Sequence, residues 1–328
     1  MSELTRRHIG RLALVALFAG PTFAQSTFPS KAVNFVVPVT TGGGTDLVAR
    51  QLAKSLADQW RQPVVVENKP GASGIIGSTA VAKRAPDGYN LLVAYDGAIV
   101  AAPVLVNRPD YTPLTQLSPI SQVSLQGYAL VVHPSVPVNN VAELIQHIKK
   151  KNAEKAPFGF ATGSPGTADH LSGETFQRMA GVELLTVHYK GTAPAIADVL
   201  GGHIPFGIFS FTGALPHIKS GALRALAVTS EKRSALLPEL PTVGETVRGF
   251  QYQSWIGVFG PAGMPEALRA RIARDIETAV NSYEMATVLM SNGLVPVAST
   301  PSAFSEFVGL EAVRTAEVIK LANIKVQQ

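Results

Sequence analysis

Residues 33–50, VNFVVPVTTGGGTDLVAR, restrict the fold of this chain more than any other segment. An apolar run at 33–39 ends before three glycines at 42–44, and apolar residues at helical spacing follow from Leu47. This order predicts a strand, a tight loop and the N-terminus of a helix. Glycines allow positive φ angles and the close approach of a ligand, and the N–H groups of a first helical turn attract an anion. We therefore expect the loop 40–46 to hold a carboxylate without a lysine or arginine.

The same segment also fits an ordinary strand-to-helix turn in which Thr45 or Asp46 is the N-cap residue. For Asp46 itself, capping is the favoured role over ligand binding, because aspartate strongly prefers that position. No Gly-Lys-Ser/Thr follows the glycines, and the Gly-x-Gly-x-x-Gly spacing is absent. The loop is therefore neither a Walker-type phosphate loop nor a dinucleotide-binding turn.

A second loop of the same kind follows the expected strand at 157–161. Residues 162–167 are rich in glycine and hydroxyl side chains, and a helix is expected to begin at Ala168. Two matching loops suit a ligand that is held from two sides. We add three polar residues at strand ends or in the first helical turn. The candidate ligand-binding residues are Thr40, Thr41, Gly42, Gly43, Gly44, Thr45, Asp46, Asp96, Thr162, Gly163, Ser164, Gly166, Thr167, His170 and Tyr189.

Strands and helices alternate along the first part of the chain. Apolar runs at 33–39, 63–68 and 89–95 are separated by stretches with helical spacing. This alternation predicts an α/β fold with a mostly parallel sheet flanked by helices. In such sheets, ligands bind at the carboxyl ends of the strands, which is where both loops and Asp96 are placed.

The remaining pattern predicts two lobes of this type. Residues 28–122 together with 252–328 are expected to form one lobe, and residues 123–251 the other. The chain would cross to the second lobe within the apolar stretch 121–133 and return at the strand 254–259. A ligand would then bind between the two lobes.

The N-terminus has the features of an export signal. Arg6, Arg7 and Arg11 precede a short apolar core at 12–19, and Thr22-Phe23-Ala24 resembles a cleavage site. The apolar core is too short for a permanent membrane helix. We expect residues 1–24 to be removed and the mature protein to be periplasmic. The paired arginines leave open whether export is by the twin-arginine or the ordinary secretory route.

Composition excludes several classes of function. The chain has no cysteine among its 328 residues, so disulfides, thiol catalysis and thiolate metal sites are impossible. Its seven histidines show no zinc-ligand spacing. The formal net charge is +5, but the basic residues are spread along the chain, so a nucleic-acid partner is not expected. We expect no cofactor and no metal.

The second loop and the start of the helix after it contain residue types that also occur in hydrolase active sites. Ser164, Asp169 and His170 invite comparison with a hydrolase triad. The local order does not form the Gly-x-Ser-x-Gly elbow, and adjacent Asp169 and His170 are poorly placed to act as orienter and base. We therefore expect no catalytic residues and no enzyme activity.

Several segments in their given order resemble the Bug family, the substrate-binding proteins of tripartite tricarboxylate transporters. They span nearly the whole chain beyond the signal. The matching segments are Phe28-Pro29-Ser30-Lys31, 37–46, 62–72, 85–89, 170–174, 189–191, 223–229 and 241–243.

The resemblance implies the fold of a two-lobed periplasmic binding protein of type II-like organisation, with α/β lobes that close on one small organic acid. The carboxylate of this acid would be held by the loops 40–46 and 162–167. It implies membrane transporter subunits as partners, and we expect a monomer. We expect an aromatic or a dicarboxylic acid. An alternative from another class is a sensor, in which the liganded protein signals through a membrane partner.

This chain departs from the family pattern near the expected site. Val39 replaces a usual aromatic residue, and Thr41 replaces a small residue or proline. Pro205 and Phe206 lie where an acidic residue is common, and Asp96 lies where small or hydroxyl residues are common. These departures concern the identity of the ligand rather than the fold.

Overall fold

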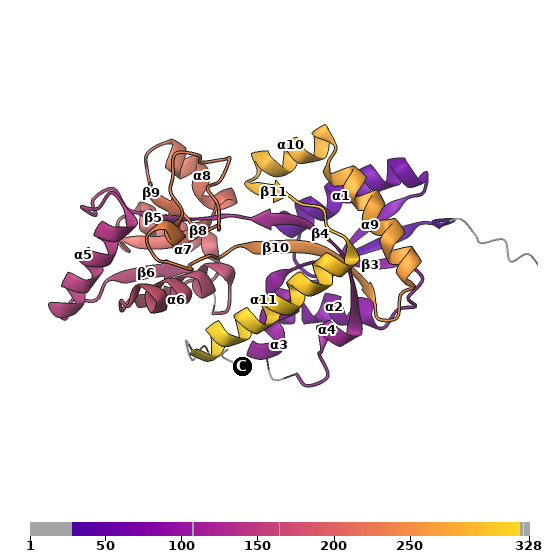
Figure 1. The fold of residues 1–328 in the computed structure, drawn as a ribbon, viewed down its shortest axis with the longest axis horizontal. Helices are drawn as coiled ribbons and strands as arrows, with labels where there is room; N and C mark the ends of the chain where they lie inside the picture. The colour runs from indigo at the N-terminus through magenta and orange to yellow at the C-terminus, as the bar shows by residue number, and fades with distance from the viewer. Residues whose placement is uncertain (1–27, 107, 164, 322–323, 325–328) are drawn as a thin grey trace, which may run out of the picture.

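The structure is a computed structural model that describes residues 28–106, 108–163, 165–321 and 324. The expected signal at 1–24 and the candidate Ser164 lie outside the described residues. The chain forms two lobes, each built on its own β-sheet (Figure 1). We call the lobe with the six-stranded sheet the first lobe and the lobe with the five-stranded sheet the second lobe.

The first lobe contains both ends of the described chain. Its strands are β1 (Val33–Val37), β2 (Val64–Asn68), β3 (Asn90–Tyr95), β4 (Leu117–Gln126), β10 (Ser254–Pro261) and β11 (Leu294–Pro296). Its helices are α1 (Gly44–Trp60), η1 (Ala72–Gly74), α2 (Ile75–Ala82), η2 (Gly97–Ala101), α3 (Ala102–Leu105), α4 (Pro113–Gln116), α9 (Glu266–Val280), α10 (Tyr283–Ser291) and α11 (Pro301–Leu321).

The sheet of the first lobe has the order β11-β4-β10-β3-β1-β2. β1 pairs in parallel with β2 and β3, as the alternating strand–helix pattern predicts. β10 is antiparallel to both β3 and β4. The parallel strands therefore come from the local β–α–β chain, whereas β10 is inserted from a distant segment.

The second lobe is formed by the middle of the chain. Its strands are β5 (Tyr128–Val132), β6 (Gly159–Thr162), β7 (Leu185–His188), β8 (Phe206–Ser210) and β9 (Arg224–Val228). Its helices are α5 (Val141–Ala153), α6 (Ala168–Ala180), α7 (Thr192–Leu200), α8 (Phe211–Lys219) and η3 (Val243–Glu245). The sheet order is β7-β6-β8-β5-β9, with β6 parallel to β7 and β8, and β5 antiparallel to β8 and β9.

Two extended segments connect the lobes. β4 of the first sheet ends at Gln126 and β5 of the second sheet begins at Tyr128, so the chain crosses at Gly127. It returns just before Ser254, the first residue of β10, which pairs with Gln126, the last residue of β4. The first sheet thus extends four residues beyond the expected boundary at 122.

Each lobe has its own apolar core. In the first lobe α1 and α9 pack Leu52, Leu56 and Ile276 against the sheet, all fully buried. In the second lobe Phe160, Phe176 and Phe206 are fully buried. Separate cores are what allow two lobes to move as units about a short connection.

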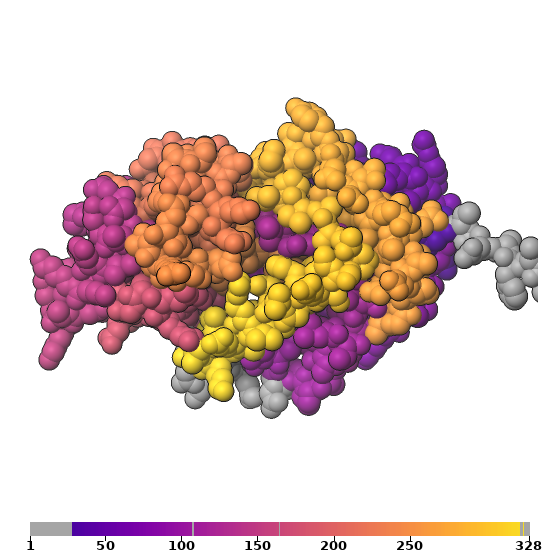
Figure 2. Space-filling model, viewed as in Figure 1, coloured from indigo at the N-terminus to yellow at the C-terminus, as the bar shows by residue number. Residues whose placement is uncertain are grey.

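Helix α11 runs across the junction of the lobes (Figure 1). It packs on β4 of the first lobe and reaches α6 of the second, where Arg178 and Glu317 approach to 3.8 Å. A groove of about 970 Å³ lies between α11 and α6, and Figure 2 shows the surface hollowed there. None of the described helices is both long and apolar enough to cross a membrane.

Candidate functional site

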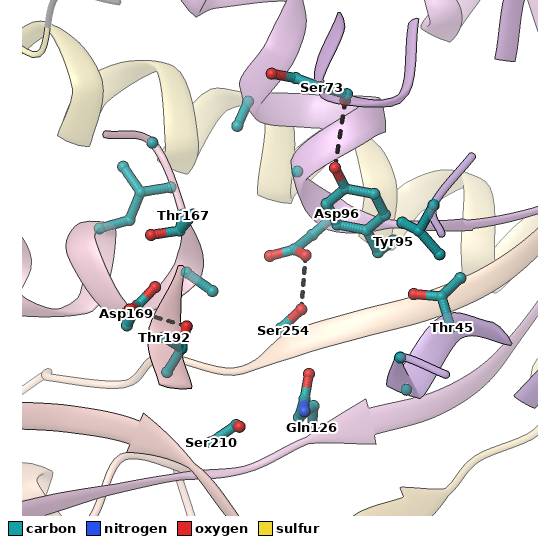
Figure 3. Close-up of a pocket in the computed structure, with 18 of the residues that line it drawn as sticks. Thr45, Ser73, Tyr95, Asp96, Gln126, Thr167, Asp169, Thr192, Ser210 and Ser254 are labelled. Atoms are coloured by element: carbon teal, nitrogen blue, oxygen red, sulfur yellow. Dashed lines mark hydrogen bonds between the residues drawn. The ribbon is translucent and has the colours of Figure 1, made fainter. Parts of the chain in front are cut away.

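A cleft of about 430 Å³ lies between the lobes, beside the two connecting segments (Figure 3). Of its 24 described lining residues, twelve have polar side chains, and ten of these are neutral. No lysine, arginine or histidine is among the described residues that line it. The polar lining residues are Thr40, Thr45, Ser73, Tyr95, Asp96, Gln126, Tyr128, Thr167, Asp169, Thr192, Ser210 and Ser254.

The glycine loop of the first lobe leads directly into the cleft. Helix α1 begins after Gly43, which is the N-cap residue, so neither Thr45 nor Asp46 has that role. Gly42 has a φ of +91°, whereas the φ of Gly43 is −84° and its backbone is extended. Only Gly42 therefore requires glycine for its backbone angle. A Cβ at Gly43 would meet no atom within 4 Å.

Asp46 is turned back onto its own loop. Its Oδ2 accepts the Gly42 N–H at 2.9 Å and the Arg50 Nε–H at 3.0 Å, and its Oδ1 accepts Asn68 Nδ2 at 2.9 Å. Burial opposes ionisation, but these hydrogen bonds, led by the one from Arg50, lower the pKa of Asp46. The carboxylate thus fixes the loop shape and does not line the cleft.

The second-lobe loop faces the first from across the cleft. Gly166, Thr167 and the first residues of α6 line it. Gly166 has a φ of +82°, and a Cβ there would come within 2.3 Å of Leu105 of the first lobe. Gly166 is therefore needed for the turn, and a side chain there would displace the end of the Leu105 side chain.

Asp169 holds that loop together. Its Oδ2 accepts the Gly163 N–H at 2.6 Å and the Thr192 hydroxyl at 3.2 Å. The neighbouring His170 makes different contacts. Its Nδ1 accepts the Gly166 N–H at 3.0 Å, and its Nε2 lies 3.4 Å from Glu174 Oε1. These contacts do not form a nucleophile–base–orienter chain.

Asp96 directly follows β3 and lines the cleft from the first lobe. It is 8% exposed, and its Oδ1 accepts the Ser254 hydroxyl at 2.6 Å. Burial raises the pKa of Asp96 to about 6, and nearby Glu311 adds to the rise, while hydrogen bonds from Ser254 and the Gly97 backbone oppose it. At neutral pH the cleft therefore contains an ionised but poorly solvated carboxylate.

The structure brings about half of the sequence-predicted residues to the cleft. Those that line it are Thr40, Gly43, Gly44, Thr45, Asp96, Gly166 and Thr167. Those placed outside its lining are Thr41, Gly42, Asp46, Thr162, Gly163, His170 and Tyr189. Thr41 and Gly42 face solvent, Thr162 is fully buried, and the Tyr189 hydroxyl donates to Asp198.

Other lining residues were not among the predictions. Thr192 begins α7, four residues after β7 ends, and Ser210 is both the last residue of β8 and the N-cap residue of α8. The strand-end rule that identified Asp96 would have found them. Gln126 and Ser254 lie on the connecting segments, and no local sequence pattern marks them.

Three large aromatic residues of the second lobe and of β10 belong to the core. Phe209, Phe211 and Trp255 are at most 1% exposed and do not line the cleft. The arrangement offers hydroxyl and amide side chains together with the first turns of α1, α6 and α7, whose N–H groups have no partner within the helix. Within the described part of the chain, no three His, Cys, Asp or Glu side chains gather as a metal site.

Comparison with known proteins agrees with this geometry. Residues 48–324 match the family described as Tripartite tricarboxylate transporter family receptor. Protein BugT of Bordetella pertussis is 35% identical over 321 residues, which cover 97% of each chain. The solved periplasmic binding protein BugD is 36% identical, with a TM-score of 0.74 over 92% of this chain and 100% of its own. The R. palustris protein Rpa4515, solved with adipate, is 32% identical with a TM-score of 0.77, covering 91% and 99% of the two chains.

These matches extend over nearly the whole chain and include solved structures of the same architecture. They confirm the expected α/β fold and the resemblance to the Bug family. The chain belongs to the family of tripartite tricarboxylate transporter receptors.

Proposed function

We propose that this protein captures a small organic acid in the cleft between its lobes and presents it to the membrane subunits of a tripartite tricarboxylate transporter. The observation that carries the proposal is the pairing of two loops. The first turns of α1 and α6 face one cleft from opposite lobes, with no basic side chain among the described lining residues. Such turns bind anions through backbone N–H groups and the helix dipole.

A dicarboxylate is the favoured ligand class. Two opposed loops suit an acid with an anionic group at each end, and the relative Rpa4515 was solved with adipate. The apolar lining from Ala101, Leu105 and Ile256 suits the carbon chain between the ends. The bound acid is released without chemical change, because the role is binding rather than catalysis.

A thermal-shift screen across organic acids tests the proposal. A ligand at 100 times its Kd adds about 2.7 kcal/mol to the free energy of unfolding, which raises the melting temperature by several degrees. We expect a subset of mono- and dicarboxylates to give this shift. If no acid in the screen stabilises the protein while neutral or cationic solutes do, carboxylate capture is wrong.

Uptake separates transport from sensing. Deletion of the gene is expected to abolish uptake of the acid that the screen identifies, whereas a sensor would leave uptake intact when its transporter is expressed separately. We further propose a periplasmic monomer that lacks residues 1–24. Intact mass and size-exclusion chromatography of the exported protein measure both properties.

A further inference from the structure

The cleft is unusual in its charge for a site that receives an anion. Two of its described lining residues are carboxylates, Asp96 and Asp169, and none is a cation. An unpaired anionic side chain in a poorly solvated site repels a bound acid. Each carboxylate must therefore be either neutralised by the protein or paired with a group on the ligand.

Asp169 is already paired within the protein. Its Oδ2 accepts from the Gly163 N–H and the Thr192 hydroxyl, at 2.6 and 3.2 Å. Asp169 is 3% exposed, and these contacts satisfy its buried carboxylate without a ligand. Asp169 is part of the loop architecture.

Asp96 is placed differently. Its Oδ1 accepts the Ser254 hydroxyl at 2.6 Å, and in Figure 3 its other oxygen points across the cleft toward the loop that carries Thr167. The titratable groups around it are Tyr95, Tyr128, Tyr252 and Glu311, and none of them is a cation. One lone-pair face of a buried carboxylate is thus directed at the space that the ligand enters.

We propose that Asp96 is a specificity-determining residue that selects acids carrying a hydroxyl or ammonium group along the carbon chain. The inference rests on the proposed function, since it concerns a second group on the same bound acid. A hydrogen-bond donor on the ligand satisfies the carboxylate oxygen that faces the cleft. A plain methylene at that point offers no donor to the carboxylate oxygen that faces the cleft, and sites that require a hydrogen bond discriminate strongly against ligands that lack it.

The variant Asp96→Asn tests this role of Asp96 directly. The amide oxygen of asparagine keeps the hydrogen bond from Ser254, so the amide NH₂ replaces the carboxylate oxygen that faces the cleft. The position changes from an acceptor to a donor while its shape is preserved. Ligands with a donor group should then lose their advantage over plain acids.

Matched acids that differ at one carbon provide the probes. Succinate, malate and aspartate form one set, and glutarate, 2-hydroxyglutarate and glutamate form a second, with propionate, lactate and alanine as monocarboxylates. Kd values would be measured by calorimetry at pH 7.5 for the wild type, Asp96→Asn and the control Asp58→Asn, an exposed carboxylate on α1. Circular dichroism confirms that each variant is folded.

The wild type and Asp58→Asn should bind the hydroxy or amino member of at least one set at least tenfold more tightly than the plain acid. Asp96→Asn should reduce that ratio to below threefold or invert it. If wild type binds plain acids as tightly as their hydroxy and amino counterparts, or if Asp96→Asn keeps the wild-type ranking, the specificity role of Asp96 is wrong while acid capture stands. If no carboxylate in these sets or in the wider screen binds the wild type, the proposed function itself fails.

Discussion

Gly42 and Gly43 are neighbours with different backbone requirements. The sequence predicts that the glycines of this loop reach positive φ, and this is correct for Gly42, at +91°, but wrong for Gly43, at −84°. The reason is that Gly43 takes the extended conformation of an N-cap residue, which any amino acid adopts. A Gly triplet in a sequence does not reveal which member carries the turn.

A pair of alanine variants tests this difference. Gly42→Ala should lower the free energy of unfolding by about 1–2 kcal/mol, because a Cβ is strained in the left-handed region. Gly43→Ala should change it by less than about 0.5 kcal/mol, since its backbone is extended and its Cβ would meet no atom within 4 Å. Urea unfolding of both variants measures the values, and equal destabilisation would contradict the assigned backbone angles.

Asp96 should make unfolding pH-dependent. Its pKa of about 6 in the folded protein exceeds the ordinary value of 3.8, so folding favours the protonated form. The stabilisation is complete below pH 4 and is lost as pH rises through 6. Asp96→Asn has no carboxyl group at this position and therefore does not lose this stabilisation. Its free energy of unfolding relative to wild type should increase between pH 4 and pH 8 by at most about 3 kcal/mol.

Denaturant unfolding of ligand-free wild type and Asp96→Asn at several pH values measures this difference. Asp58→Asn is the matched control, because it removes the same charge from an exposed position on α1. A constant difference between Asp96→Asn and wild type from pH 4 to pH 8 would show that Asp96 is not buried as described.

At the scale of elements, the loop before α6 depends on Asp169. Asp169→Ala leaves the Gly163 N–H and the Thr192 hydroxyl without this acceptor, which should cost about 2 kcal/mol of stability. The loop that carries Gly166 and Thr167 should then lose its shape, and the affinity for the acid should fall at least tenfold. Calorimetry and urea unfolding measure the two effects.

Asp198→Ala is the matched control in the same lobe. Asp198 accepts the Tyr189 hydroxyl and does not line the cleft. Its removal should lower stability without changing affinity more than about threefold, because the cleft loop is intact. Equal losses of affinity in both variants would contradict the role given to Asp169.

Local pattern predicts the β–α units well and the inserted elements poorly. β1, α1 and β2 follow from apolar runs, glycines and helical spacing, and the structure has them close to the expected positions. β4 contains Pro119, a residue that local rules disfavour within a strand, yet it pairs with β10 along its length. That pairing joins segments far apart in sequence, so no local window contains the signal.

Helix α8 shows a second limit. It begins at Phe211, directly after β8 ends at Ser210, and the apolar stretch 204–211 conceals the change from strand to helix. Pro216 lies inside the helix, where local rules disfavour it. α10 does carry a local signal, since the Ser282 hydroxyl accepts the Met285 N–H as an N-cap, and closer attention to caps would have predicted it.

At the scale of the whole molecule, two separate cores joined at Gly127 and before Ser254 suit a hinge motion. The acid that the screen identifies should close the lobes and lower the radius of gyration in small-angle X-ray scattering. The reduction should saturate at one acid per protein. An unchanged scattering curve at saturation would mean that the cleft is preformed in its closed shape.

The two-lobed arrangement could be predicted because strands and helices alternate along each half of the chain. The cleft lining could be predicted only where it follows a strand end, as for Thr45, Asp96 and Thr167. Gln126 and Ser254 reach the cleft because the connecting segments pass beside it, which depends on how the lobes are joined.

The central claim is that a small organic acid binds in the cleft between the loops of α1 and α6. Calorimetric titration of the acid with the largest thermal shift into wild type and Gly43→Val tests it most directly. The extended backbone at Gly43 accepts valine, and the added side chain enters the open cleft beside the first turn of α1. We predict one site in wild type and no measurable binding by Gly43→Val with an unchanged circular dichroism spectrum, and wild-type affinity in Gly43→Val would contradict the claim.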